Sequence, residues 1–411
     1  MRTIKHRIVY LIESLNVGGA ERALLRLAKV AKQRGHNPQI WVYREKGSLL
    51  SDFLDARIPV FDCSNWNWHP MGWGSKRSVL QSVLSLQVSR PTVFHSFSWL
   101  GDRSEPISVS LSGIQGYIIR LASAEPMGLP EAWELKYALA DRIVVLTESA
   151  RSRLLDRRPN LESRVRVIPN GVDTNLFAPI HQQSKKVFKQ KLGLKEESFV
   201  ITSVARLHAQ KNQVGLIQAF GELCSRTTKD TYLWLIGTGP DRQQLEKLVA
   251  EMNLTSRVFF LGTQPDVYPF VSASDLFVLL SRPPSEGGVE SMSNALLEAM
   301  SCGVPAIVSR CGTEEVVTDG QDGFVVSWDN HEMIVDRLTQ MTDKIDTWKM
   351  FGAKARLKIL HKYTLTRTVE ANLMIYEELA RRHNGIARLS TFGRIQLGRI
   401  PHWFRSRLYF P

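Results

Sequence analysis

The chain has 411 residues, 43% of them hydrophobic and 23% charged, which is typical of folded globular proteins and sufficient for two domains of roughly 150–200 residues each. No segment approaches the roughly 20 apolar residues of a membrane-spanning helix, so we expect the chain not to cross a bilayer. The formal net charge of +13 indicates an anionic partner: a nucleotide diphosphate, a nucleic acid or an acidic membrane surface.

The first predicted element is a buried strand at residues 8–12, which is too short for the apolar core of a signal peptide. We therefore expect no export. A tight turn at Gly18 and Gly19 follows, and then a helix over residues 20–34 in which Leu24, Leu27, Ala28 and Ala31 share one face. Strand, glycine turn and helix together predict the first unit of a doubly wound sheet.

The alternation of short β-rich runs and amphipathic helices continues through both halves of the chain. In the first half, strands are predicted at residues 39–43, 92–95, 107–111, 142–146 and 165–168. In the second half, strands are predicted at residues 199–204, 232–236, 258–261, 276–280, 306–308 and 323–326. This order predicts an α/β fold class, with two parallel sheets covered by helices on both faces.

Turn residues and changes in composition predict the domain boundaries. An N-terminal domain spans residues 1–172, and a linker with Asn-Gly and Pro punctuation spans 173–190. The C-terminal domain spans 191–370, and a helix at 371–385 crosses back toward the N-terminal domain. The last segment, 386–411, is a basic aromatic tail without acidic residues.

Two segments favour a membrane surface as a partner. Residues 65–74 carry three tryptophans in a loop punctuated by glycine and proline, and the tail 386–411 combines arginines with aromatic residues. A packed tryptophan loop and a disordered tail are the alternatives. Nucleic-acid binding is not predicted, because no recognised module or basic-aromatic platform is present.

The four cysteines show neither CxxC nor Cys/His spacing, so we expect reduced structural thiols, no metal site and a cytoplasmic protein. Peripheral binding at the inner face of the membrane is compatible with that location.

Several strand-to-helix turns carry residues suited to an anionic ligand. Gly18 and Gly19 can bring backbone N–H groups close to a phosphate at the start of a helix, although a simple tight turn is the alternative. Arg206 and Lys211 lie five residues apart in the turn after the strand at 199–204, where two cations can neutralise a diphosphate. Gly239 and Gly262 follow the next two strands, where backbone groups can approach a ligand.

The strongest constellation surrounds the helix that follows the strand at 276–280. Glu290 lies in the preceding loop, Ser293 and Asn294 offer N–H groups at the helix start, and Glu298 is expected one turn into the helix on its exposed side. One carboxylate can accept hydrogen bonds from sugar hydroxyls, the helix start can hold phosphate, and the second carboxylate can bind the ribose hydroxyls. Acidic residues that only complement the helix dipole are the alternative.

In combination and in order, these residues resemble the retaining glycosyltransferases of family 4 (glycosyl transferases group 1). The resemblance covers most of the chain and is carried by Gly-Gly-Ala-Glu from Gly18, by Val-Ile-Pro-Asn-Gly-Val-Asp from Val167, by Arg206 with Lys211, and by Glu290-x7-Glu298. It implies the GT-B fold, in which two facing Rossmann-like domains enclose a cleft. It also implies that the N-terminal domain binds the acceptor and the C-terminal domain the nucleotide sugar.

The resemblance further implies a role for each candidate residue. Arg206 and Lys211 would hold the donor diphosphate, Glu298 the ribose, and Glu290 would lie near the transferred sugar. Gly18 and Gly19 would reach across from the acceptor domain. Arg206, Lys211 and the helix dipole would stabilise the leaving diphosphate without an essential metal or cofactor, and the sugar would keep its anomeric configuration.

Two departures from the family pattern concern the donor sugar. Glu290 is followed by Ser291 where the family usually has glycine, but it alone has the required spacing to Glu298. Some members carry a histidine after the strand corresponding to 107–111, where this chain has Ser112 and Gly113. His95 is a weaker candidate for the sugar contact, with a structural role as the alternative.

The implied reaction moves a hexose-type sugar from a nucleotide-diphosphate sugar to a saccharide or polyprenyl-linked saccharide in cell-surface polysaccharide or lipopolysaccharide assembly. A sugar-nucleotide epimerase on the same fold and a catalytically inactive GT-B binding subunit are the alternatives.

Overall fold

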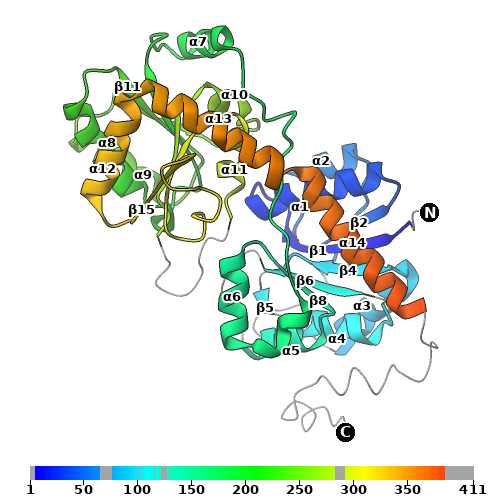
Figure 1. The fold of residues 1–411 in the computed structure, drawn as a ribbon. Helices are drawn as coiled ribbons and strands as arrows, with labels where there is room; N and C mark the ends of the chain where they lie inside the picture. The colour runs from blue at the N-terminus through cyan, green and yellow to red at the C-terminus, as the bar shows by residue number, and fades with distance from the viewer. Residues whose placement is uncertain are drawn as a thin grey trace. The chain divides into compact units, whose positions relative to one another are not determined.

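The computed structural model describes residues 5–64, 76–98, 100–101, 103–114, 116–121, 127–128, 130–282 and 292–384. The chain divides into two compact units, which we call unit 1 and unit 2 (Figure 1). Unit 1 contains residues 1–169 and the C-terminal residues from 367 onward, and unit 2 contains residues 170–366. The predicted linker segment 173–190 is part of unit 2.

Unit 1 is built on a parallel sheet with the order β3-β2-β1-β4-β6-β8-β9. Its strands are β1 (Arg7–Ser14), β2 (Asn37–Glu45), β3 (Val60–Asp62), β4 (Val93–Ser96), β6 (Tyr117–Leu121), β8 (Arg142–Val145) and β9 (Val165–Val167). Two short strands, β5 (Leu100–Gly101) and β7 (Met127–Gly128), pair separately. Alternate residues of β1 enter opposite layers: Val9 and Leu11 join one apolar cluster, whereas Tyr10 meets Tyr376 of the C-terminal helix.

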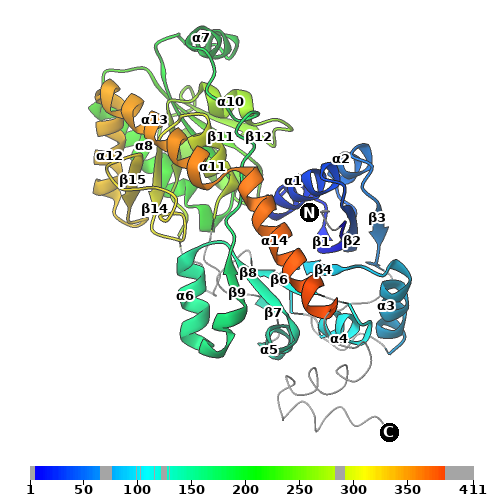
Figure 2. The ribbon, with the colours of Figure 1, turned by 45° about the vertical axis from the view of Figure 1, so that its right-hand side comes forward.

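Helices connect the strands of unit 1 and cover its sheet (Figure 2). They are α1 (Gly19–Gln33), α2 (Leu50–Asp55), α3 (Lys76–Ser89), α4 (Ser104–Leu111), α5 (Pro130–Leu139), α6 (Glu148–Arg157), the 3-10 helix η2 (Pro159–Arg164) and α14 (Leu365–Asn384). On α1 the predicted apolar face is confirmed, because Leu24, Leu27, Ala28 and Ala31 are buried. Gly35 follows this helix with φ +85°, a left-handed conformation that favours glycine.

The prediction of a strand at residues 107–111 is wrong, because these residues belong to helix α4. The strand of this region is β6, ten residues later, which the sequence analysis missed. A fully buried ion pair explains part of the difference. Glu105 in the first turn of α4 lies 2.7 Å from Nζ of Lys136 on α5 and accepts a hydrogen bond of 2.8 Å from the Tyr117 hydroxyl on β6. The helical segment thereby satisfies three polar groups inside the core.

Unit 2 contains a second parallel sheet with the order β12-β11-β10-β13-β14-β15. Its strands are β10 (Phe199–Val204), β11 (Thr231–Ile236), β12 (Val258–Gly262), β13 (Leu276–Leu279), β14 (Ala306–Ser309) and β15 (Gly323–Val326). All six were predicted to within two residues. The order places β10 and β13 next to each other at the centre, with the chain progressing outward in opposite directions from this pair.

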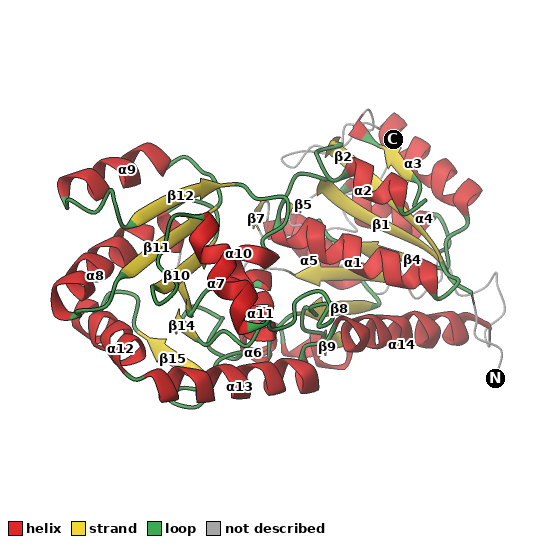
Figure 3. Cartoon of the chain, turned by 90° about the horizontal axis from the view of Figure 1, so that it is seen from above, coloured by secondary structure: helices red, strands yellow, loops and turns green. Residues whose placement is uncertain are grey.

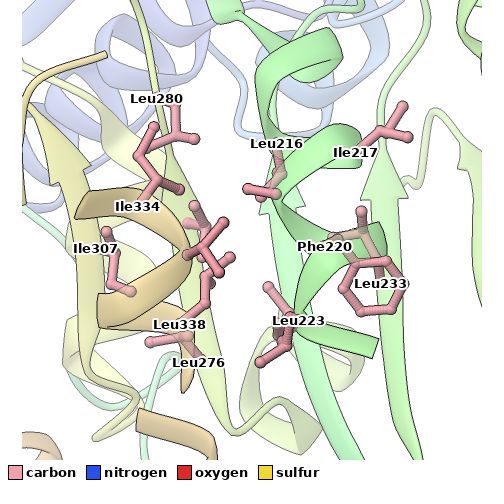
Figure 4. Packing of buried hydrophobic residues seen from close by; sticks show 14 of the residues in the cluster. Leu216, Ile217, Phe220, Leu223, Leu233, Leu276, Leu280, Ile307, Ile334 and Leu338 are labelled. Carbon is pink, nitrogen blue, oxygen red and sulfur yellow. The ribbon is translucent and has the colours of Figure 1, made fainter. Parts of the chain in front are cut away.

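Helices cover both faces of this second sheet (Figure 3). They are α7 (Gln182–Lys191), η3 (Ala209–Lys211), α8 (Gln213–Arg226), α9 (Arg242–Glu251), α10 (Tyr268–Ala273), α11 (Asn294–Ser301), α12 (His331–Asp343) and α13 (Ile345–Lys362). Leu216 and Phe220 of α8 pack with Ile334 and Leu338 of α12 over one face, as Figure 4 shows. Val200 and Trp234 point into a separate cluster on the other face, with Phe188 of α7 and Phe270 of α10. The domain is therefore doubly wound, as predicted.

The segment 173–190 belongs to unit 2 because polar contacts fix it there. Phe177 presents its carbonyl oxygen to Arg356 and Ser301, at 2.8 and 2.6 Å. On α7, the ammonium groups of Lys185 and Lys189 each lie 2.7 Å from the buried carboxylate of Asp275. A segment with these buried ion pairs is a structural part of the unit.

All four cysteines are free thiols. No helix in the described part of the chain combines the length and the apolar character that a membrane span needs.

Candidate functional site

The strand order of unit 2 identifies the place where a ligand can bind. β10 pairs with β11 on one side and with β13 on the other, so the connections after β10 and β13 leave the sheet in opposite directions. In open α/β sheets, ligands bind beyond the carboxyl ends of the strands at such a switch point. The turn that carries Arg206 and Lys211 follows β10, and the chain after β13 leads to α11 with Ser293, Asn294 and Glu298.

Backbone hydrogen bonds fix the loop that carries Arg206. Leu207 donates its N–H to the carbonyl of Thr238 at 3.0 Å, and its own carbonyl accepts from the N–H of Asp241 at 3.3 Å. The loop after β10 is therefore tied to the loop after β11 on the residue next to Arg206. The side chain of Arg206 is exposed to solvent, on a loop whose backbone is fixed.

The glycines after β11 permit this close approach. A Cβ on Gly237 would lie 2.1 Å from the carbonyl oxygen of Ala205, and a Cβ on Gly239 would lie 2.0 Å from that of Leu207. Gly237 also has φ +133°. Gly239 thus allows the loops after β10 and β11 to pack closely, and it affects the candidate site through that packing. Its predicted contact with the donor stays a prediction.

Gly239→Ala is expected to separate the two loops and to weaken nucleotide diphosphate binding by about tenfold or more, because a backbone atom cannot move aside as a side chain can. Isothermal calorimetry with UDP, GDP and ADP measures the effect. Gly320→Ala is the control: Gly320 has φ +70° but nothing within 4 Å of its Cβ position. It should cost about 1 kcal/mol of stability and leave binding unchanged. Equal binding by the two variants would show that the loop contact does not matter.

Lys211 ends the short helix η3, and its side chain is half-buried. The next residue, Asn212, adopts the left-handed conformation with φ +50° and caps α8 by accepting a hydrogen bond from the N–H of Gly215 at 3.3 Å. Its side-chain amide also donates to the carbonyl of Trp328 at 3.1 Å. Asn212 therefore fixes the end of the loop that carries Lys211.

Arg282 is a residue of this region that the sequence analysis missed. It follows β13, and its N–H and its guanidinium Nε donate to the carbonyls of Gln210 at 2.8 Å and Ala209 at 2.6 Å. The guanidinium carbon also lies 5.9 Å from the centre of the Trp328 ring. Arg282 thus ties the chain after β13 to the Lys211 loop across the switch point. Its position directly after a predicted strand was the signal that could have revealed it.

Helix α11 begins at Ser293 and Asn294, where a helix start was predicted. The hydroxyl of Ser293 caps the helix and accepts from the N–H of Leu296 at 3.4 Å, and Asn294 is the first helical residue. Glu298 lies one turn further on. The expectation that Glu298 faces solvent is wrong, because its residue surface is only 3% exposed.

The carboxylate of Glu298 affects the pKa of the neighbouring thiol of Cys302. Burial raises the pKa of the Cys302 thiol, and the negative charge of Glu298 raises it further, against the lowering effect of Arg356. Cys302 is therefore an inert thiol at neutral pH.

Glu290 lies outside the described residues, so its role as a catalytic and donor-binding residue stays a prediction. Gly262 ends β12 with φ +66°, accepts a hydrogen bond of 2.8 Å from the N–H of Gly237, and leaves open space around its Cβ position. The backbone conformation alone accounts for glycine at 262.

The glycine pair of unit 1 lies at the start of α1, where Gly18 is the N-cap and Gly19 the first helical residue. The carboxylate of Glu21 folds back over it, so that a Cβ on Gly18 would meet Oε2 of Glu21 at 2.3 Å. Burial raises the pKa of Glu21, a hydrogen bond from its own backbone lowers it, and Glu13 raises it further. A phosphate bound here would have to displace this carboxylate from the positive end of the helix.

His95 lies at the end of β4 and is fully buried, with 0% of its surface exposed. Its Nδ1 is 2.8 Å from the hydroxyl of Tyr376 on α14, and its ring packs against Phe97 at 4.8 Å and Tyr10 at 5.8 Å between centroids. Burial lowers the pKa of His95 well below its usual value, and Arg120 lowers it further. The imidazole ring is therefore neutral, and it holds α14 through the hydrogen bond with Tyr376. The predicted contact of His95 with a sugar stays a prediction.

The same edge of unit 1 contains two charged residues that the sequence analysis did not consider. Glu13 is a buried residue near the end of β1 and pairs with Arg44 at 2.6 Å, while Arg120 of β6 is buried over the ring of Phe97 at 4.7 Å. Burial lowers the pKa of Arg120 to about 10. No group of three His, Cys, Asp or Glu residues that could hold a metal ion occurs among the described residues.

Comparison with known proteins agrees with this architecture. The family model described as "Glycosyltransferase Family 4" matches residues 17–176, and the model described as "Glycosyl transferases group 1" matches residues 184–358. The two models together cover most of both units.

Two curated relatives are similar over part of the chain. The UDP-Gal:alpha-D-GlcNAc-diphosphoundecaprenol alpha-1,3-galactosyltransferase of Escherichia coli is 32% identical over 220 residues, which is 53% of this chain and 54% of the relative. The lipopolysaccharide core biosynthesis glycosyltransferase LpsD of Rhizobium meliloti is 33% identical over 171 residues, 41% of this chain and 47% of the relative. The chain spans about half the length of the curated relatives it matches.

Solved structures share the fold over nearly the whole chain. A glycosyltransferase from Rickettsia africae superposes with a TM-score of 0.77 at 18% identity, covering 91% of this chain and 98% of that one. Anabaena Alr3699/HepE in complex with UDP and glucose superposes with a TM-score of 0.75 at 19% identity, covering 93% of this chain and 100% of that one. The predicted GT-B fold is confirmed, and the chain belongs to the family 4 glycosyltransferases, with a group 1 glycosyltransferase domain in its C-terminal half.

Proposed function

We propose that this protein is a retaining glycosyltransferase that moves a hexose-type sugar from a nucleotide-diphosphate sugar to a saccharide or lipid-linked saccharide. The observation that carries the proposal is the fixed loop after β10, which presents Arg206 and Lys211 at the switch point of unit 2. Two cations on one loop can neutralise the two phosphate groups of the donor.

Charge stabilisation is the chemistry that this loop supplies. When the bond between the anomeric carbon and the phosphate oxygen breaks, negative charge grows on the diphosphate that leaves. Arg206 can bind two phosphate oxygens at once, Lys211 adds a point charge, and the N–H groups at the start of α11 lie across the switch point. Groups that are already in place cost no reorganisation during the reaction, so we propose that no metal ion is required.

The relatives support a donor and an acceptor class. One relative is named for transfer from UDP-Gal to a sugar on diphosphoundecaprenol, another for lipopolysaccharide core biosynthesis, and HepE has been solved with UDP-glucose. We propose a UDP-sugar as the first donor to test and a polyprenyl-linked saccharide as the acceptor. With such an acceptor, we propose that the protein works at the inner face of a membrane, in cell-surface polysaccharide or lipopolysaccharide assembly.

The test measures binding and turnover separately. Calorimetry without added metal should show binding of one of UDP, GDP and ADP, and the matching nucleotide sugar should transfer its sugar to a lipid-linked saccharide with retained anomeric configuration, seen by NMR. Nucleotide release with an epimerised free sugar and no need for acceptor would identify an epimerase. An inactive binding subunit would bind the nucleotide without turnover, and absence of any nucleotide binding would contradict the proposal.

A further inference from the structure

Helix α3 of unit 1 carries an apolar stripe on its solvent-facing side. Leu80, Leu84 and Val88 are spaced four residues apart and therefore lie in one line along the helix. Their exposed fractions are 59%, 52% and 83%. Leu86 and Ser82, on the opposite side of the helix, are buried. A surface helix of a globular domain normally presents polar residues to water, so α3 has an apolar face that nothing in the described structure covers.

The neighbouring helix α4 also exposes an apolar residue. α3 packs against α4, whose last residue, Leu111, is 54% exposed. The two segments 76–98 and 103–114 contain a single acidic residue, Glu105, which is buried in its pair with Lys136. The surface formed by Leu80, Leu84 and Val88, which we call the α3 surface, therefore has no carboxylate on its own segment.

A cationic pocket adjoins the α3 surface at the end of α3. The cavity has a volume of about 560 Å³, and its lining includes Gln87, Arg90, Thr92, Ser112 and Arg7. Arg7 and Arg90 supply two guanidinium groups, and within the described part of the chain neither group makes a side-chain hydrogen bond or an ion pair. Hydroxyl and amide groups beside two unpaired guanidiniums suit a phosphate group.

From this juxtaposition we infer that the α3 surface docks on an anionic phospholipid bilayer, with Arg7 and Arg90 binding a lipid phosphate at the edge of the apolar stripe. A helix lies in a bilayer surface when its apolar side chains enter the acyl region and nearby cations reach the headgroups. Charge complementarity favours an anionic bilayer over a protein partner, because the segment 76–98 that carries the apolar side chains also carries Arg90 and contains no acidic residue. The inference rests on the proposed function, and it assigns the peripheral membrane contact to the α3 surface.

The test is cosedimentation of the full chain with vesicles of phosphatidylcholine, with and without phosphatidylglycerol. The triple variant Leu80→Gln, Leu84→Gln, Val88→Gln should bind the anionic vesicles at least about tenfold more weakly than the wild type, because three apolar side chains no longer enter the bilayer. The double variant Arg7→Gln, Arg90→Gln should lose on the order of tenfold of the preference for anionic over neutral vesicles.

A matched control lies on α13 of unit 2. Met350, Leu357 and Leu360 are exposed by 40% to 54%, so their triple replacement by glutamine removes a similar apolar surface elsewhere. This control should bind vesicles like the wild type. Wild-type binding by the α3 variant, or loss of binding only in the α13 variant or only on deletion of residues 386–411, would overturn the inference.

A change from dimer to monomer in the α3 triple variant, with vesicle binding unchanged, would show instead that a second copy covers the surface. Circular dichroism and UDP binding, measured on every variant, establish that unit 1 and unit 2 remain folded. Vesicle binding needs neither donor nor acceptor, and turnover is read with a water-soluble saccharide acceptor. A failure of the proposed glycosyl transfer is therefore distinct from a failure of the docking surface.

Discussion

Lys211→Ala is expected to lower kcat/KM for sugar transfer by about 10²–10³-fold, the usual effect of removing one preorganised group that stabilises a leaving anion. UDP binding should weaken by about 1–3 kcal/mol, because a charge-assisted contact to phosphate is lost. The loop itself should survive, since Asn212 caps α8 and Arg282 holds the carbonyls of residues 209 and 210 independently of the lysine side chain. Steady-state kinetics and calorimetry, both without added metal, measure the two effects.

The matched control for this variant is Lys247→Ala. Lys247 lies on α9, its side chain is 79% exposed, and its only ion pair among the described residues is a surface pair with Glu251. Its loss removes the same charge from the net total and should leave both kcat/KM and UDP binding unchanged. If the two lysine variants behaved alike, the loop after β10 would not be the diphosphate site, and the proposed function would lose its main support.

Arg206 and Lys211 could be located from the sequence because their context was regular. A β-rich run ends at Val204, a helix starts at Gln213, and short turns between such elements occur at the carboxyl edge of a parallel sheet. The structure confirms both elements. What the sequence could not reveal is the hydrogen bonding between the loops after β10 and β11, because it joins Leu207 to Thr238 and Asp241, which are remote from it in sequence.

The two errors have a common cause. Residues 107–111 alternate apolar and polar side chains, which is typical of a strand, but they belong to helix α4, whose Glu105 makes a buried ion pair with Lys136 of α5. Glu298 was expected on the exposed side of its helix, yet it is buried in α11. Glu105 pairs with a residue that is remote in sequence, and in both cases local periodicity does not tell which charged side chains the tertiary structure buries.

Asp275→Asn is expected to destabilise unit 2 by about 3–5 kcal/mol, the usual cost of removing one partner from a buried ion pair. Asp275 is 5% exposed, its two carboxylate oxygens each lie 2.7 Å from an ammonium group of Lys185 or Lys189, and Oδ2 also accepts from the N–H of Val200 at 2.9 Å. Without the carboxylate, two ammonium groups on α7 lose their counter-charge inside the unit. Urea unfolding followed by tryptophan fluorescence measures the loss.

A surface pair of the same unit provides the control. Lys195 and Asp230 are 2.7 Å apart, and the lysine side chain is 80% exposed. Asp230→Asn should therefore cost no more than about 1 kcal/mol. A loss of stability of equal size in the two variants would show that burial does not strengthen the pair at Asp275.

The dependence on pH gives a second readout with a defined sign. Burial alone would raise the pKa of Asp275, but Lys185 and Lys189 outweigh it, so the folded protein holds the pKa below the ordinary value of 3.8. A carboxylate with a lowered folded-state pKa contributes stability above its unfolded-state pKa and loses it as the pH falls through the folded-state value. The stability difference between the wild type and Asp275→Asn should thus be constant near neutral pH and shrink below about pH 4. A difference that grew on acidification would mean that the folded unit raises the pKa of Asp275 instead of lowering it.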